Sequence, residues 1–260
     1  MSELEGLRAQ LKQLNLHTVA HLFEEEALKA AKTQMTYVAF LGRLVEEELA
    51  AKVDRSINAR IAKAKLPMLR TLEQFDFAFQ PTLSAARIRE LAELGFLARA
   101  ENILFVGRPG VGKTHLAIAL ALKACQQRKR VLFRSTLDLL AQLRAAEVSR
   151  TLSRFIETLG RLDLLVIDEL GYTPMDDQVA QLFFQLINHL YTRVSVLITT
   201  NVTFDTWGTV FGGNQVIAAA VLDRLLHHSH VFLITGPSYR MKDKLSTLLD
   251  QQTESDYNRV

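Results

Sequence analysis

The sequence contains little that would suit an extracellular or membrane protein. Cys125 is the only cysteine in 260 residues, so no internal disulfide can form. No apolar run approaches the roughly 20 residues of a membrane-spanning helix, and the opening MSELEGLRAQLKQLN holds no apolar segment of signal-peptide length. Strong charge is missing too, because the net charge is only +3. We therefore expect a soluble, cytoplasmic protein with no membrane partner, and the mild basicity alone identifies no acidic partner.

Helix-breaking residues are scarce at the start of the chain. Proline is absent before Pro67, glycine occurs there only at Gly6 and Gly42, and leucines recur at helical spacing. Residues 1–66 are therefore predicted to be an all-helical first domain that binds DNA or a partner, with residues 37–66 forming one long amphipathic helix.

Positive charge collects near the end of that predicted helix. Residues 52–70 carry six Lys or Arg against a single acid, Asp54. This is either an ordinary solvated helix face or a basic arm that contacts nucleic-acid phosphates. On the second interpretation, the candidate DNA contacts are Arg55, Arg60, Lys63 and Lys65.

A change of pattern follows at Pro67. Residues 67–100 are predicted to be a linker and the start of the second domain, and the alternation of Phe75, Phe77 and Phe79 suggests a short extended segment that packs onto that domain. Residues 101–260 then show apolar runs separated by helical stretches: NILFVG, RVLFRS, LDLLVIDE, VSVLITTN and HVFLITG. This pattern predicts an α/β domain, a parallel five-stranded sheet sandwiched by helices.

The first of these runs leads into a glycine-rich loop. The loop fits G-x-x-x-x-G-K-[ST] between a predicted strand and a predicted helix, and its residues are Gly107, Arg108, Pro109, Gly110, Val111, Gly112, Lys113 and Thr114. Glycines let backbone N–H groups surround phosphate oxygens, and the helix N-terminus adds a favourable dipole. Lys113 can reach the β- and γ-phosphates and the Thr114 hydroxyl can bind Mg²⁺. With this context a chance match is the lesser explanation, and we expect ATP and Mg²⁺ as ligands.

Polar residues stand at the ends of two later apolar runs. Asp168 and Glu169 end LLVIDE, and Asn201 ends LITTN. Ligands of open α/β sheets bind at the carboxyl ends of the strands, so these residues should lie near the phosphates. Asp168 would orient Mg²⁺, Glu169 would polarise the attacking water, and Asn201 would sense the γ-phosphate. The plainer alternative is an acidic pair and a turn residue that merely end their strands.

At this point the sequence resembles the AAA+ ATPases, and among them the helicase-loader group that includes DnaC and the insertion-sequence transposition helper IstB. The resemblance covers most of the chain and rests on GRPGVGKTHLA, LLVIDELGY, LITTNVTFDTWGTVF and AAAVLDRLLHHSHVFLITGPSYRMKD. It extends the nucleotide-binding segment to His115, and it is nearest to IstB.

The resemblance also gives roles to two arginines. Arg224 in LDRLLHH would be an arginine finger that enters the nucleotide site of a neighbouring subunit, and Arg240 in GPSYR would contact phosphate in its own subunit. A guanidinium suits either task because it stabilises charge on a transferring phosphoryl group. The alternative is a helix-surface pair of Asp223 with Arg224 and an ordinary surface position for Arg240.

A second basic stretch covers residues 123–161. It holds nine Lys or Arg against three acids, and Arg150 and Arg154 are predicted to share the face of one helix. Few aromatic residues lie between them, which favours duplex DNA over stacked single strands. Together with Arg144 they are candidate DNA contacts, unless they simply solvate helices.

The resemblance implies an ATPase that forms a multimer on duplex DNA, with active sites at subunit interfaces. It would deform target DNA and stimulate an IstA-like transposase. Three alternatives stay open: a DnaC-like loader of a replicative helicase, a small-molecule P-loop phosphotransferase, and a scaffold that binds ATP without turnover.

Overall fold

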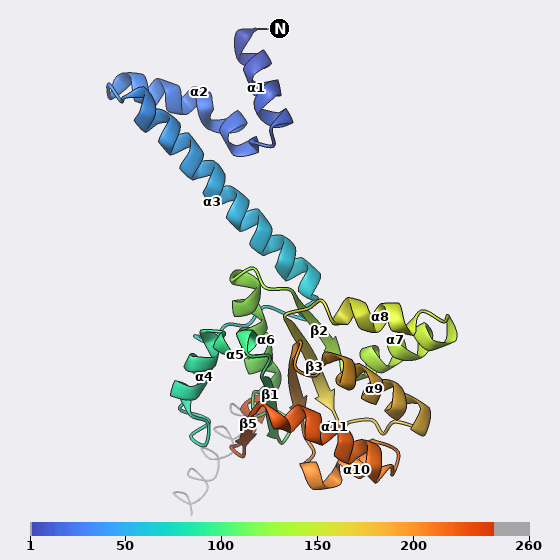
Figure 1. Cartoon of the computed structure of the whole chain (residues 1–260). Coiled ribbons are helices and arrows are strands. Elements are labelled where there is room, and N and C mark those ends of the chain that lie inside the picture. Colours follow the sequence, from blue (N-terminus) through green and yellow to red (C-terminus); the bar gives the residue numbers. More distant parts are fainter. Residues whose placement is uncertain (1, 242–260) are drawn as a thin grey trace, which may run out of the picture. The chain divides into compact units, whose positions relative to one another are not determined.

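The computed structural model of the chain describes residues 2–241 (Figure 1). The chain divides into two compact units between Ala59 and Arg60, inside the helix α3 (Tyr37–Ala64). This division reflects compactness alone, so the domain limits at residues 66 and 100 stay predictions.

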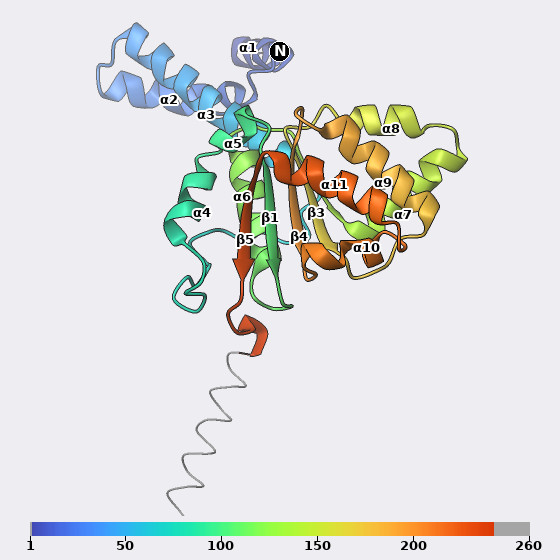
Figure 2. The same cartoon turned by 60° about the horizontal axis from the view of Figure 1, so that its bottom comes forward.

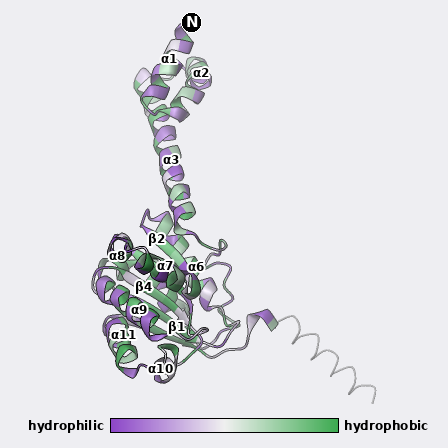
Figure 3. Cartoon of the chain, turned by 90° about the vertical axis from the view of Figure 1, so that its right-hand side faces the viewer, coloured by the Kyte–Doolittle hydropathy of each residue, from purple (hydrophilic) through white to green (hydrophobic). Residues whose placement is uncertain are grey.

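The first unit consists of helices, as the sequence indicates. They are α1 (Glu3–Gln13), α2 (His17–Lys32) and the first part of α3. The chain turns between them at Asn15 and Gln34, whose φ angles of 56° and 52° are left-handed. Hydrophilic and hydrophobic residues alternate along these helices (Figure 3). A small core of Val19, Phe23 and Leu44 joins α2 to α3.

A buried carboxylate also joins these two helices. The side chain of Glu48 on α3 is only 3% exposed, and it accepts hydrogen bonds from the backbone N–H groups of Thr18 and Val19 at 2.7 and 3.1 Å. The first N–H groups of a helix have no partner within it, and Leu16, which precedes α2, offers no side-chain cap. Glu48 therefore caps α2 from a neighbouring helix.

The linker differs from its prediction in one respect. Helix α3 ends at Ala64, where Lys65 takes a left-handed φ of 57°, and residues 65–84 form turns and bends. Phe75 and Phe77 do pack against the core of the second unit, with ring centroids 4.8 Å apart. The predicted extended conformation is wrong, because the backbone turns so that the Phe75 N–H reaches the Leu72 carbonyl at 3.1 Å.

The second unit holds the predicted five-stranded parallel sheet, in the order β2-β3-β4-β1-β5 (Figures 1 and 2). The strands are β1 (Asn102–Gly107), β2 (Val131–Ser135), β3 (Leu164–Leu170), β4 (Ser195–Thr200) and β5 (Ser229–Ile234). The helices are α4 (Ala85–Ala92), α5 (Gly95–Ala98), α6 (Lys113–Gln126), α7 (Thr136–Val148), α8 (Leu152–Leu159), α9 (Asp177–Leu190), α10 (Trp207–Val210) and α11 (Gln215–His227), with short 3₁₀ turns η1 (Phe204–Thr206) and η2 (Tyr239–Met241).

Each face of the sheet carries its own hydrophobic core. Successive strand residues point to opposite faces, so Ile103 packs with α4, α5 and α6, whereas Leu104 packs with α7, α9 and α11. Figure 2 shows these two helical layers on either side of the strands. Trp207 and Phe211 are fully buried in the second core. Among the described helices, none has the length and apolarity required to cross a membrane.

Candidate active site

The glycine-rich loop joins β1 to α6 at the carboxyl edge of the sheet. Gly110 and Gly112 have φ angles of 84° and 99°, which side-chain-bearing residues rarely adopt. A Cβ on Gly110 would overlap the Ser238 hydroxyl, and one on Gly112 would lie 2.5 Å from the Phe75 ring. The Lys113 ammonium donates to the carbonyls of Gly107 and Arg108 at 2.7 and 2.9 Å. The loop is therefore a tight backbone cradle with one cation beneath it.

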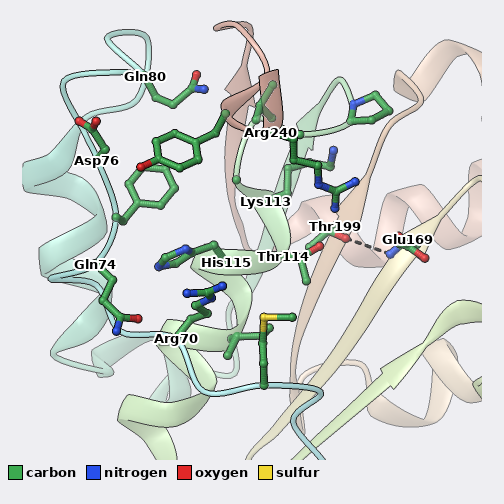
Figure 4. Close-up of a pocket in the computed structure, with 18 of the residues that line it drawn as sticks. Arg70, Gln74, Asp76, Gln80, Lys113, Thr114, His115, Glu169, Thr199 and Arg240 are labelled. Atoms are coloured by element: carbon green, nitrogen blue, oxygen red, sulfur yellow. Dashed lines mark hydrogen bonds between the residues drawn. The ribbon is translucent and has the colours of Figure 1, made fainter. Parts of the chain in front are cut away.

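A cavity of about 380 Å³ opens over this loop (Figure 4). Several of the proposed site residues line it: loop residues Pro109 to Thr114, His115, Glu169 and Arg240. Gly107 and Arg108 do not line it. The linker supplies further lining residues that sequence reasoning missed: Met68, Arg70, Gln74, Phe75, Asp76 and Gln80.

His115 connects the linker to the first turn of α6. Its Nε2 lies 2.8 Å from the Thr71 carbonyl, and its ring meets the Phe75 ring edge-on at 5.3 Å. Because Phe75 also covers Gly112, the linker, the loop and α6 form one packed structure. His115 thus lines the cavity and also holds the linker that forms its wall.

Lys113 interacts electrostatically with the charged side chains around the cavity. Burial lowers the pKa of Lys113, and Arg240 lowers it further, although Asp168 and Glu169 act in the opposite direction. Lys113 is 7% exposed. Three cationic side chains, Arg70, Lys113 and Arg240, line one small cavity, which suits a polyanionic ligand.

Asp168 is held close to the loop. It is buried at the end of β3, where its two carboxylate oxygens accept from the Thr114 hydroxyl at 2.9 and 3.2 Å. The Thr136 hydroxyl donates to its backbone carbonyl at 2.9 Å. Thr114 and Asp168, predicted from segments 54 positions apart, thus lie side by side.

Glu169 has an unusual backbone. Its φ is 63°, and the pairing of β3 with β4 shifts register between Ile167 and Leu170. The Glu169 N–H donates to the hydroxyl of Thr199 at 2.9 Å (Figure 4), and the same hydroxyl donates to Asp168 Oδ1. Thr199 lines the cavity, and sequence reasoning missed it. The one available signal is a polar residue near the carboxyl end of the strand, and it does not distinguish Thr199 from Thr200.

Asn201 follows β4 directly rather than lining the cavity. Its Oδ1 is buried, and no hydrogen-bond partner for it exists among the described residues. The structure thus brings Asn201 to the correct edge of the sheet and leaves its carbonyl oxygen unpaired.

The segment after β5 closes the cavity from the other side. The Tyr239 N–H donates to the Gly110 carbonyl at 2.9 Å, and the Gln80 side chain donates to the Pro237 carbonyl at 2.8 Å. These contacts hold η2, and with it Arg240, over the loop. The last two residues of the motif that predicted this segment, Lys242 and Asp243, lie outside the described residues.

Arg224 lies elsewhere, on α11. Its guanidinium donates to Asn188 Oδ1 on α9 at 2.9 Å and to the Ala220 carbonyl at 2.8 Å, and it stacks over the Phe184 ring at 4.9 Å. It does not line the cavity of its own chain. These contacts replace the Asp223 pairing that the plainer alternative supposed.

The candidate DNA contacts divide into three groups by pairing and exposure. Arg55 pairs with Glu48 at 2.8 Å, and Arg144 pairs with Asp176. Arg60 is half-buried, whereas the remaining candidates are exposed: Lys63, Lys65, Arg150 and Arg154.

Arg150 and Arg154 do not share a helix face, so that prediction is wrong. Arg150 has a φ of 55° and lies in the turn between α7 and α8, while Arg154 is on α8. Helix α7 ends because Arg150 takes the left-handed conformation and the Thr151 N–H turns back to the Ala146 carbonyl at 2.7 Å, so the next helix begins only at Leu152.

The phosphate cradle, the acidic pair at the end of β3 and the insertion of β4 between β1 and β3 define an AAA+ ATPase. The chain belongs to the family described as IstB-like ATP binding protein, which it matches over residues 9–247. Sequence reasoning had identified this family correctly.

Similar proteins cover nearly the full chain. A protein described as an ATP-binding protein of insertion sequence IS21 from Pseudomonas aeruginosa is 44% identical over 245 residues, which is 94% of this chain and 91% of that protein. Its counterpart in insertion sequence IS5376 of Geobacillus stearothermophilus is 39% identical over 240 residues, or 92% and 95% of the two chains.

Solved structures share the fold. AMPPCP-bound DnaA from Aquifex aeolicus has a TM-score of 0.56 at 22% identity, covering 70% of this chain and 56% of that one. DnaI has a TM-score of 0.53 at 19% identity, covering 64% and 91%. At these identities the likeness concerns the fold alone.

Proposed function

We propose that this ATPase assembles on duplex DNA, deforms it, and delivers it to the transposase of its insertion sequence. The observation that carries the proposal is the distribution of arginines: Arg240 lines the cavity, whereas Arg224 is held at a distance from it on α11. A site with one arginine in place and another held away from it is suited to completion by a second subunit.

Within one subunit, the chain's residues have separable tasks. The N–H groups of the loop and the Lys113 ammonium bind the β- and γ-phosphates. The Thr114 hydroxyl and the Asp168 carboxylate are hard oxygen donors 2.9 Å apart, which fits Mg²⁺. Bound there, the ion would neutralise charge on the phosphates. Asp168 and Thr114 would hold the ion at a fixed position beside the loop.

Hydrolysis consumes ATP and water and yields ADP and phosphate. The exposed Glu169 carboxylate at the cavity takes the proton of the attacking water as the water oxygen bonds to the γ-phosphorus. Asn201 would accept a hydrogen bond from this water at its unpaired Oδ1, or donate one to the γ-phosphate through its amide N–H groups. Arg240 would stabilise charge on the phosphates in cis.

Arg224 would act in trans. Asn188, Ala220 and Phe184 fix its guanidinium in place, so little conformational freedom is lost when it meets a neighbour's phosphate. Turnover would then require assembly, and ATP would serve as the assembly switch with hydrolysis as the release step.

Exposed cations support a DNA partner. Lys63, Lys65, Arg150 and Arg154 are the stronger candidates, because Arg55 and Arg144 already pair with carboxylates. The insertion-sequence names of the relatives in P. aeruginosa and G. stearothermophilus support a transposase as the partner. The same names favour transposition over helicase loading.

The test is to measure ATP hydrolysis and assembly size together, with and without duplex DNA. Wild type should show both values raised by duplex, with an affinity that falls steeply as salt increases. An R150A/R154A variant should lose the response to duplex, while R161A, which removes another exposed arginine just after α8, should keep it. A monomer indifferent to duplex would overturn the proposal.

Glu169→Gln separates a cycling ATPase from a scaffold that binds ATP without turnover. In a cycling enzyme this variant should bind ATP, lose hydrolysis and remain trapped on DNA. A scaffold would release DNA at the wild-type rate.

A further inference from the structure

The Asp168–Glu169 pair poses a geometric problem. Successive side chains of a regular strand point to opposite faces of the sheet, so two adjacent carboxylates would not normally serve one cavity. Asp168 is nonetheless buried against Thr114, and Glu169 lines the cavity beside it. Something in the fold must turn one of them.

A bulge in β3 provides the turn. Ile167 pairs with Ile198 and Leu170 pairs with Thr200, so Asp168 and Glu169 together stand opposite the single residue Thr199. Bulges of this kind redirect a side chain, and they cost energy when a residue other than glycine takes a left-handed φ. Glu169 does so, with φ at 63°.

Thr199 contacts both members of the pair. It is 1% exposed, its hydroxyl proton is donated to Asp168 Oδ1, and its oxygen accepts the Glu169 N–H at 2.9 Å. One hydroxyl has one proton to donate and lone pairs to accept. Both capacities are therefore used, one on the side chain of Asp168 and one on the backbone of Glu169.

We propose that Thr199 is a positioning residue of the ATPase site, whose single hydroxyl fixes the Asp168 carboxylate and the bulged Glu169 backbone in one arrangement. Thr199 does not itself meet the reacting atoms. It makes the spacing between the metal-orienting and the water-polarising carboxylates a fixed property of the apoprotein. The inference rests on the proposed role of Glu169.

The neighbouring threonine offers a matched control. Thr200 is also fully buried, but among the described residues its hydroxyl hydrogen-bonds only to Val202, whose N–H it accepts at 3.2 Å and whose carbonyl it reaches at 3.4 Å. Thr199→Val and Thr200→Val thus remove the same hydroxyl from adjacent buried positions, and only the first touches the acidic pair. Thr199→Ser keeps the hydroxyl and removes a methyl group.

The first readout is independent of activity. Hydrogen exchange of the Glu169 amide in the full-length protein should accelerate at least about tenfold in T199V, because its acceptor is gone. It should stay near the wild-type rate in T199S and in T200V. An unchanged rate in T199V would overturn the proposal whether or not the enzyme hydrolyses ATP.

The second readout is the split between kcat and KM in basal ATP hydrolysis without DNA. T199V should lose about 10- to 100-fold in kcat, as expected for a small displacement of catalytic groups, while its KM stays within about threefold of wild type. T199S should recover most of the kcat. Equal losses in T199S and T199V would overturn the proposal.

Two checks keep the outcomes distinct. If T199V fails to fold, as judged by thermal unfolding, the comparison of T199A with T199S takes its place with the same expectations. If E169Q keeps full turnover, the proposed role of Glu169 fails, and the amide-exchange result still decides the structural role of Thr199.

Discussion

The Tyr239 N–H donates to the Gly110 carbonyl at 2.9 Å, which joins the segment after β5 to the phosphate loop. Because Arg240 follows Tyr239 directly, the position of this arginine depends on the conformation of the loop. A ligand that reshapes the loop would therefore also move Arg240. The two ends of the second unit's described chain, the linker and η2, both rest on this loop.

Gly110→Ala tests that dependence. Gly110 has a φ of 84°, and a Cβ there would overlap the Ser238 hydroxyl. We expect ATP affinity to fall at least about tenfold, because the loop and η2 must separate. Titration with a fluorescent ATP analogue measures this.

Gly213→Ala is the matched control, since Gly213 has a φ of 85° but open space around it. It should lose some thermal stability from backbone strain alone and keep its ATP affinity. Equal effects of the two substitutions on ATP affinity would show that the contact between Gly110 and the segment after β5 does not matter for ATP binding.

Glu48→Gln tests the cap on α2. Burial alone would raise the pKa of Glu48, but the N–H of Val19, the Arg55 guanidinium and the N–H of Thr18 together lower it below 4.5. We expect a loss of about 1–3 kcal/mol in the stability of the first unit, because a charged acceptor becomes neutral. Hydrogen exchange over residues 17–23 of the full-length protein should accelerate, while exchange in β1 should not.

The pH dependence of this effect has a definite sign. As pH falls, the unfolded chain takes up the Glu48 proton before the folded chain does, because the pKa of Glu48 is higher in the unfolded chain. The stability that Glu48 contributes is therefore complete above pH 4.5 and is lost as pH falls through the lower pKa of the folded state. Wild type and E48Q should therefore differ at pH 7 and converge in strong acid. A difference that is independent of pH would contradict the role of the charge.

Cys125 should be unreactive in the folded protein. It is fully buried on α6, and burial raises its pKa from 9.0 to about 11. At pH 8 this leaves about a hundredfold fewer thiolates than an exposed cysteine has. Ellman's reagent should label the native protein slowly and the urea-unfolded protein at once.

The same shift predicts a loss of stability in alkali. Between pH 9 and about 11 the unfolded chain loses the thiol proton while the folded chain keeps it, so stability falls as pH rises. For the labelling experiment, rapid reaction of Cys125 in the native protein at pH 8 would contradict its protection and show that the core around α6 opens readily.

Strong local signals were sufficient for most of the fold. The five strands follow from continuous apolar runs, and the phosphate loop follows from its glycines. The strand order could not be predicted from the residues alone, because the pairing of β1 with β4 joins segments that are far apart in the sequence. The extended conformation predicted for the linker is wrong because three alternating phenylalanines are compatible with two structures. One is a strand, and the other is a series of turns that packs two of the rings against a core.

The residues of the candidate site also divide into those that the sequence identifies and those that only the structure identifies. Lys113, Thr114, Asp168 and Glu169 are identifiable from spacing, since each belongs to a motif with a chemical rationale. Thr199 is not, because its importance arises from a bulge in the neighbouring strand, and a bulge leaves no periodic trace in sequence. The Arg150 error has a similar origin, since a left-handed arginine that ends a helix resembles any other exposed arginine.

The most direct test of the account is to mix two inactive variants in the presence of ATP and duplex DNA. R224A subunits keep Glu169, and E169Q subunits keep Arg224, so a complete site forms only where an R224A cavity meets an E169Q neighbour. Completion in trans predicts that an equal mixture regains about a quarter of wild-type turnover, since one interface in four is intact. A mixture no more active than its separate components would contradict it.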